Sequence, residues 1–216
     1  MYEEALEIHK YLPIRKNSLE DEYITHLWQV FFTLDSSNES VQPFMIMPFH
    51  LLFMLALQYK VLRISKELNS DYSLVFTMKN FRNVETLSQP ISVFDFSLLQ
   101  ERTLPDLFRL IGLDESLIVK IKKLVDYRND KLAHANGGIA QEFNLKIEEY
   151  LRCLREVQKK FLKLNNLIAN EFKLEMSPDD APSEFIEIKL LNSYLCQADF
   201  NEGILKETFG EVGSYV

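Results

Sequence analysis

The sequence predicts an all-α protein. Two long segments carry apolar residues at helical spacing, and only short stretches alternate apolar and polar side chains as strands do. With 216 residues, of which 47% are hydrophobic and 12% aromatic, the chain can bury a large core. We therefore expect one helical bundle with a small additional segment.

The first half of the chain contains three predicted helices. Residues 2–12 and about 21–34 place apolar side chains at helical spacing. The second of these follows Ser18, with Asp21 three residues later, which resembles a capping box. Residues 43–67 are the most apolar part of the sequence and predict a long buried helix.

Residues 68–102 give a mixed signal. The stretches LVFTM (74–78) and ISVFDF (91–96) are rich in β-branched and aromatic residues, which favour strands. Short strands or an irregular segment are both compatible with this composition.

Two helices are expected between residue 104 and the motif described below. Leu104 to Ile111 predicts a short helix, with Pro105 in its first turn and Gly112 at its end. A longer helix follows Asp114 and continues through IVKIKKLVDYR.

The longest periodic signal lies after the glycine pair at 137–138. Eight apolar residues there alternate steps of four and three, the heptad spacing of a helix packed along its length: Phe143, Ile147, Tyr150, Leu154, Val157, Phe161, Leu164 and Ile168. An intramolecular bundle and a seam with a second subunit both explain the pattern.

The proline- and acid-rich SPDDAPS (177–183) predicts a boundary between a helical domain, 1–176, and a C-terminal appendage, 177–216. Within this appendage FIEIKLL alternates like a strand, so the appendage is expected to be irregular or to contain β structure.

Composition limits the compartment and the partners. The two cysteines, Cys153 and Cys196, match no disulfide or metal-ligand spacing, and the first ten residues lack the pattern of a secretory signal. The apolar run at 44–57 is too short for a membrane span. We expect a cytoplasmic protein that has no membrane partner.

The net charge of −8 comes from both ends of the sequence. Residues 41–174 carry 19 basic and 15 acidic side chains, so a local basic site can exist there.

The stretch DYRNDKLAHANGG (126–138) carries the clearest functional signal. Arg128 shares a helix face with Leu124 and Val125, so its guanidinium points toward the core or a partner and needs an acid, a carbonyl or a phosphate. His134 would face away from Arg128 if the helix continued. The glycines after it let the backbone turn and bring the imidazole back.

An arginine and a histidine together suit chemistry on a phosphodiester. Arginine donates a planar fork of hydrogen bonds to phosphate oxygens, and histidine exchanges protons near neutral pH. RNA supplies its own nucleophile, the 2′-hydroxyl, so no metal or other cofactor is required. Residues 117–134 carry a charge of +3, and Lys120, Lys123 and Lys131 are the candidate RNA-binding residues.

Arg128-Asn129, followed by four residues and His134, resembles the R-N-x(4)-H form of the motif of HEPN domains, the "higher eukaryotes and prokaryotes nucleotide-binding" superfamily. The resemblance covers about residues 40–172. It implies a helical bundle, a two-fold homodimer, and metal-independent endoribonuclease activity in toxin–antitoxin or anti-phage systems. It also implies that Arg128 and His134 carry catalysis, that Asn129 helps to position them, and that an antitoxin or regulatory protein can be a partner. Some members have a tyrosine two residues after the histidine, where this chain has Asn136.

Other interpretations stay open. Arg128 and His134 can be structural residues at a helix end, and an inactive HEPN-like domain would serve as an interaction module. Asp179, Glu187 and Lys189 weakly resemble the metal-dependent PD-(D/E)xK nuclease pattern, although their spacing is short. His50 is interpreted as a hydrogen-bonded core residue, and Trp28 with its neighbouring phenylalanines as core packing.

Overall fold

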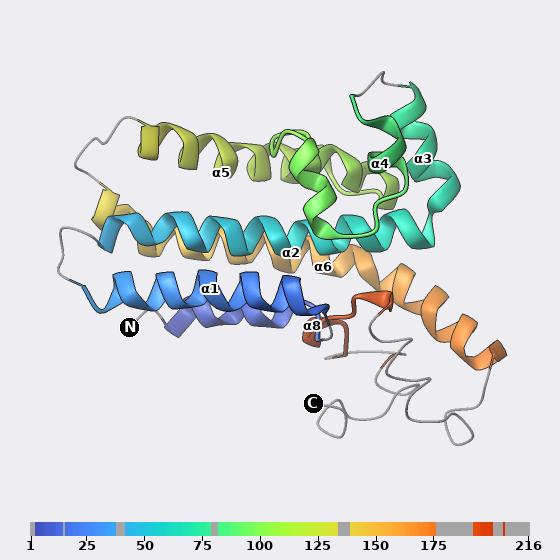
Figure 1. Ribbon diagram of the computed structural model, residues 1–216, viewed down its shortest axis with the longest axis horizontal. Coiled ribbons are helices and arrows are strands. Elements are labelled where there is room, and N and C mark those ends of the chain that lie inside the picture. The colour runs from blue at the N-terminus through green and yellow to red at the C-terminus, as the bar shows by residue number, and fades with distance from the viewer. Residues whose placement is uncertain are drawn as a thin grey trace.

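A computed structural model describes residues 3–14, 16–37, 42–78, 82–133, 139–175, 192–200 and 205. These residues are almost entirely helical and contain no β-sheet, which confirms the all-α fold class. Figure 1 shows long helices lying side by side, with short helices at one end of the bundle. No helix among the described residues is long and apolar enough to cross a membrane.

The first helices match the predicted ones closely. A 3-10 helix, η1, spans Glu3–Tyr11, and α1 spans Ser18–Asp35. The cap of α1 is Asn17 rather than the predicted Ser18, because the Asn17 side chain accepts a hydrogen bond from the Glu20 N–H at 2.9 Å. A short 3-10 turn, η2 (Gln42–Met45), leads into α2 (Ile46–Glu67).

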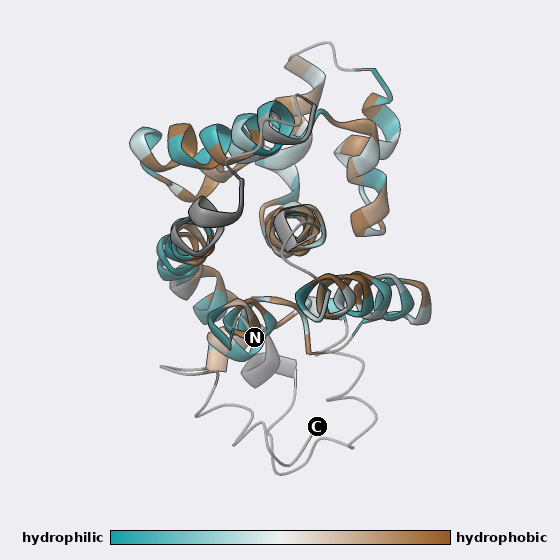
Figure 2. Ribbon diagram, turned by 90° about the vertical axis from the view of Figure 1, so that its left-hand side faces the viewer, coloured by the Kyte–Doolittle hydropathy of each residue, from teal (hydrophilic) through white to brown (hydrophobic). Residues whose placement is uncertain are grey.

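Helix α2 forms the centre of the bundle. Seventeen of its 22 residues are buried, so it is covered on nearly every side. The end-on view in Figure 2 shows a mostly hydrophobic helix surrounded by the other elements. A helix buried all round must be apolar over most of its surface, which explains the composition of 43–67.

The strand alternative for residues 74–78 and 91–96 is wrong. Residues 74–78 belong to α3 (Asn69–Met78), in which Tyr72 and Phe76, one helical turn apart, are buried on one face. After α4 (Val84–Ser88), the second stretch forms the 3-10 helix η3 (Val93–Leu98). Ser92 and Asp95 make a capping box there, so local capping outweighs the β propensity of the aromatic residues.

The remaining helices follow the predictions. Helix η4 spans Leu104–Ile111 and ends at Gly112, whose φ of 71° is in the left-handed region that glycine adopts without strain. Helices α5 (Glu115–Ala133) and α6 (Ile139–Glu175) then pack against each other and against α2. The 37 residues of α6 extend about 55 Å. From Ile147 onward, every member of the heptad series in α6 is buried.

Residues on the far side of the predicted domain boundary pack onto the bundle. The boundary itself, 177–183, and the predicted strand FIEIKLL lie outside the described residues, as do Asp179, Glu187 and Lys189. Residues 192–200, including α8 (Gln197–Phe200), contact α6 and η1. The backbone N–H of Ile14 donates to the Leu195 carbonyl at 2.8 Å, and Pro13 and Cys196 form an isolated antiparallel bridge.

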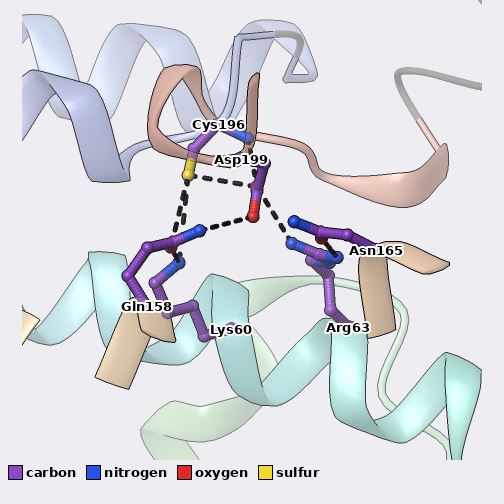
Figure 3. A network of polar contacts seen from close by, with 6 residues as sticks. All are labelled: Lys60, Arg63, Gln158, Asn165, Cys196 and Asp199. Carbon is purple, nitrogen blue, oxygen red and sulfur yellow. Dashed lines mark hydrogen bonds and ion pairs between the residues drawn. The ribbon is translucent and has the colours of Figure 1, made fainter. Parts of the chain in front are cut away.

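A buried polar network fastens this C-terminal stretch to the core (Figure 3). Arg63 of α2 donates to the Asp199 carboxylate at 2.9 Å and to the Asn165 side chain at 2.6 Å. Lys60 donates to Gln158, whose amide in turn donates to Asp199 at 2.7 Å. Although burial alone would raise the pKa of Asp199, Arg63 and Lys60 hold it well below its usual range.

Replacing Asp199 with alanine should lower the free energy of unfolding by about 3–5 kcal/mol, because Arg63 would keep a buried charge without a counter-ion. Urea unfolding followed by circular dichroism measures this loss. Glu22→Ala, which removes an exposed carboxylate of α1, is the control and should change stability by under about 0.5 kcal/mol. Equal small effects of the two substitutions would contradict a structural role for the network.

Candidate functional site

Arg128 lies in the last third of α5 and is largely buried, with 18% of its side chain exposed. Its Nη2 donates to a carboxylate oxygen of Glu101, which lies in the turn between η3 and η4. The expectation that the guanidinium needs an acid, a carbonyl or a phosphate is thus met by an acid. The Arg128 Nε is buried without a hydrogen-bond partner.

Glu101 also faces a buried histidine. The Nε2 of His50, on α2, lies 3.5 Å from the same Glu101 oxygen, which is long for a hydrogen bond. The Nδ1 of His50 lies 2.9 Å from the hydroxyl of Tyr150 on α6. Polar contacts therefore connect Arg128 to Glu101, Glu101 to His50 and His50 to Tyr150, although the buried His50 Nε2 makes no hydrogen bond.

The charges around His50 determine its tautomer. Burial lowers the pKa of His50, so the ring is neutral near pH 7. A neutral ring is stable next to the Glu101 carboxylate only if Nε2 carries the proton and points it at the acid. We infer that Nδ1 then accepts from Tyr150. Tyr150 has one proton, so its 3.3 Å contact with the Leu124 carbonyl is the weaker of its two interactions.

Glu101 is held in its ionised form. Its contact with His50 lowers its pKa most, and Arg128 lowers it further, against the opposing effect of burial. The carboxylate remains partly exposed and lines a cavity of about 290 Å³ between α1, α2 and η3. The other cavity residues are mostly apolar: Tyr23, Leu51, Met54, Leu55, Gln58, Val93, Phe94 and Ser97.

The other candidate residues do not gather around Arg128. Asn129 is exposed on α5, Lys131 lies in the last turn of α5 with its side chain outside the described part, and His134 lies outside the described residues. Lys120 and Lys123 are exposed and line a separate groove between α5 and α6. Lys122, another basic residue of the segment 117–134, is paired with Asp106 at 2.7 Å.

Sequence reasoning missed two of the residues connected to Arg128 by polar contacts. Glu101 lies in a polar turn, and Tyr150 is one of the heptad residues, so neither stands out from its local pattern. His50 is indeed a buried, hydrogen-bonded core residue, but its link to Glu101 connects it to Arg128. Trp28 is buried as expected, stacked on His9 with ring centroids 4.3 Å apart.

Comparisons with protein families, with curated proteins and with solved structures found no match. Among the described residues, no group of three or more histidine, cysteine, aspartate or glutamate side chains is arranged to hold a metal ion. The candidate site is therefore argued from its geometry alone. Glu101 holds the guanidinium of Arg128 in a largely buried position near the C-terminal end of α5.

Replacing Glu101 with glutamine should destabilise the protein by about 1–2 kcal/mol at pH 7, because Arg128 loses a charged acceptor. The folded-state pKa of Glu101 lies below its ordinary 4.5, so its stabilising effect is complete above pH 4.5 and is lost as the pH falls through the folded value. The difference in the free energy of unfolding between wild type and Glu101→Gln should therefore become smaller below about pH 4.5. Urea unfolding at several pH values measures this difference.

Glu148→Gln provides the control for this series, because Glu148 forms a half-exposed ion pair with Arg155 at 2.9 Å. Such pairs contribute under about 1 kcal/mol. A pH-independent difference for Glu101→Gln, or one no larger than that of the control, would contradict the role assigned to Glu101.

Proposed function

We propose that the protein is a metal-independent endoribonuclease of the HEPN type, in which Arg128 and His134 act on the phosphodiester. The observation that carries the proposal is the position of Arg128. Glu101 holds its guanidinium near the end of α5, next to the connection that carries His134 in the sequence. A preorganised arginine contributes more to a transition state than one that must be ordered during the reaction.

The proposed reaction uses the 2′-hydroxyl of the substrate. An imidazole of His134 removes the proton of that hydroxyl, and the 2′-oxygen bonds to phosphorus while the bond from phosphorus to the 5′-oxygen breaks. Arg128 donates hydrogen bonds to the non-bridging oxygens, on which negative charge increases. A protonated imidazole returns a proton to the leaving 5′-oxygen. The products are a 2′,3′-cyclic phosphate and a 5′-hydroxyl.

The resemblance to HEPN domains supplies the rest of the proposal. A two-fold dimer would provide two Arg128 and two His134 side chains to one cleft, and so one imidazole for each proton transfer. Asn129 is exposed near the end of α5 and would help to position the pair. By the same resemblance, the protein would act as a toxin or anti-phage effector restrained by an antitoxin or another regulatory protein.

One observation favours a second candidate, a non-catalytic helical interaction module. The Glu101 carboxylate satisfies Arg128 within the chain, so the arginine can be explained as a structural residue that needs no substrate. The two candidates make opposite predictions for the same substitutions.

His134→Ala should abolish RNA cleavage, and also toxicity on expression, with little change in thermal midpoint. Arg128→Ala should inactivate the protein as well and cost more stability, because it leaves the Glu101 carboxylate without its cation.

Purified protein in EDTA should cut single-stranded RNA, leave DNA intact and produce 2′,3′-cyclic ends detectable by mass spectrometry.

Asn129→Ala should reduce the rate of RNA cleavage less than His134→Ala or Arg128→Ala does. Activity that requires Mg²⁺ or degrades DNA would contradict the proposed mechanism. Folded Arg128→Ala and His134→Ala variants that behave as wild type would support the interaction module instead.

Light scattering at micromolar concentration should give twice the chain mass of 25.4 kDa, since the proposed cleft needs two copies of the motif. Dimerisation should persist in His134→Ala, which removes only the proposed proton carrier. A strictly monomeric protein that still cleaves RNA would contradict the shared cleft.

A further inference from the structure

A groove with a volume of about 380 Å³ lies between α5 and α6. Its floor is apolar and consists of Leu117, Leu124 and Cys153. Burial raises the pKa of the Cys153 thiol to about 11, so the thiol is neutral at physiological pH and adds no charge to the floor. The volume lies within the range of sites that bind small organic groups, about 300–1,000 Å³.

The rim of the groove has an excess of positive charge. Its two acids are already neutralised, since Glu149 pairs with Lys146 at 2.8 Å and Glu156 with Lys159 at 2.6 Å. By contrast, Lys120, Lys123 and Arg152 are exposed and have no carboxylate partner within the described part of the chain. Three unpaired cations around an apolar floor are complementary to a ligand that carries both negative charge and a flat apolar group.

We propose that this groove binds a segment of single-stranded RNA, with phosphates on Lys120, Lys123 and Arg152 and a base against the apolar floor. Grooves that bind single strands combine positive charge along the backbone with aromatic side chains on which bases stack, and here the apolar floor takes the place of the aromatic side chains. A purely anionic partner would leave the partly exposed Leu117 side chain without a contact, whereas a purely apolar one would leave the three cations unpaired.

The direction of the groove connects it to the proposed reaction, and this part of the inference rests on the proposed function. From Leu117 to Leu124 on α5, and from Glu156 to Lys146 on α6, the groove runs toward the connection between the two helices. His134 belongs to that connection in the sequence. Lys146 lies over the Tyr127 ring, 4.9 Å from its centroid, at the end of the groove nearest the connection. RNA bound in the groove would therefore extend toward the motif.

The test measures binding of a short, fluorescein-labelled 2′-O-methyl RNA, which cannot be cleaved because its 2′-hydroxyl is blocked. Charge reversal at two exposed groove positions, Lys120→Glu with Arg152→Glu, should weaken binding at least about tenfold in fluorescence anisotropy and flatten its salt dependence. Lys10→Glu provides the control, since Lys10 is an exposed lysine of η1 and does not line the groove. The control variant must change the charge by the same amount, so Lys10→Glu is combined with Arg82→Glu, a substitution at an exposed residue that does not line the groove.

Equal binding by the groove variant and wild type would overturn the inference, and so would equal weakening by the control variant. Displacement of the RNA by polyglutamate at the same charge concentration would overturn it in favour of an acidic protein partner. Displacement by AMP at the same nucleotide concentration would indicate a free nucleotide instead of a strand.

Cleavage of unmodified RNA, measured in parallel, separates this inference from the proposed function. Wild type that binds through the groove without cleaving RNA would support the groove and contradict the ribonuclease. Wild type that cleaves RNA while the groove variant binds normally would support the ribonuclease and overturn the groove.

Discussion

The burial of two cations on α2 is the constraint on which the fold depends. Lys60 and Arg63 lie within one turn of the central helix and are almost fully removed from water. Removing such charges from water costs several kcal/mol each unless other groups replace their hydration. The replacement comes from Gln158 and Asn165 on α6 and from Asp199, while both cations also lie over the ring of Phe161. Enclosing α2 therefore requires residues distant in sequence, and the stretch at 192–200 is part of the bundle for this reason.

The same two helices support the candidate site. About three and a half turns before Arg63, α2 carries His50, and α6 contributes Tyr150, which meets His50 in the core. Glu101 then joins this buried pair to the largely buried Arg128. Because His50 and Tyr150 are packed among Phe49 and Phe53, the carboxylate that holds Arg128 is itself held by the core. The position of Arg128 is thus a property of the whole bundle and does not depend on α5 alone.

Patterns that repeat along one helix were sufficient to predict most of the fold. The heptad series of α6, the apolar run of α2, and the Pro105 start and Gly112 end of η4 all have local physical causes. The partner of Arg128 was not predictable in the same way. The helix face of Arg128 showed that it needed an acid, a carbonyl or a phosphate, but Glu101 is 27 residues away and reaches it only through a turn that has no periodic pattern. Likewise, the basic segment 117–134 suggested one set of residues around Arg128, whereas Arg128 pairs with Glu101 and Lys120 and Lys123 line the groove between α5 and α6.

The contact between the two ends of the described chain has a consequence for synthesis on the ribosome. Pro13 pairs with Cys196, and Glu7 forms an ion pair at 2.7 Å with Arg155, so these two contacts of the N-terminal segment form only after most of the chain has been made. At about 5–20 residues per second, η1 stays without these contacts for roughly ten seconds or more. The cations of α2 also lack Asp199 during that time, so the nascent bundle is incompletely closed and exposes apolar surface. Exposed apolar surface of this kind makes a partly folded chain prone to aggregation until residues 192–200 have packed onto the bundle.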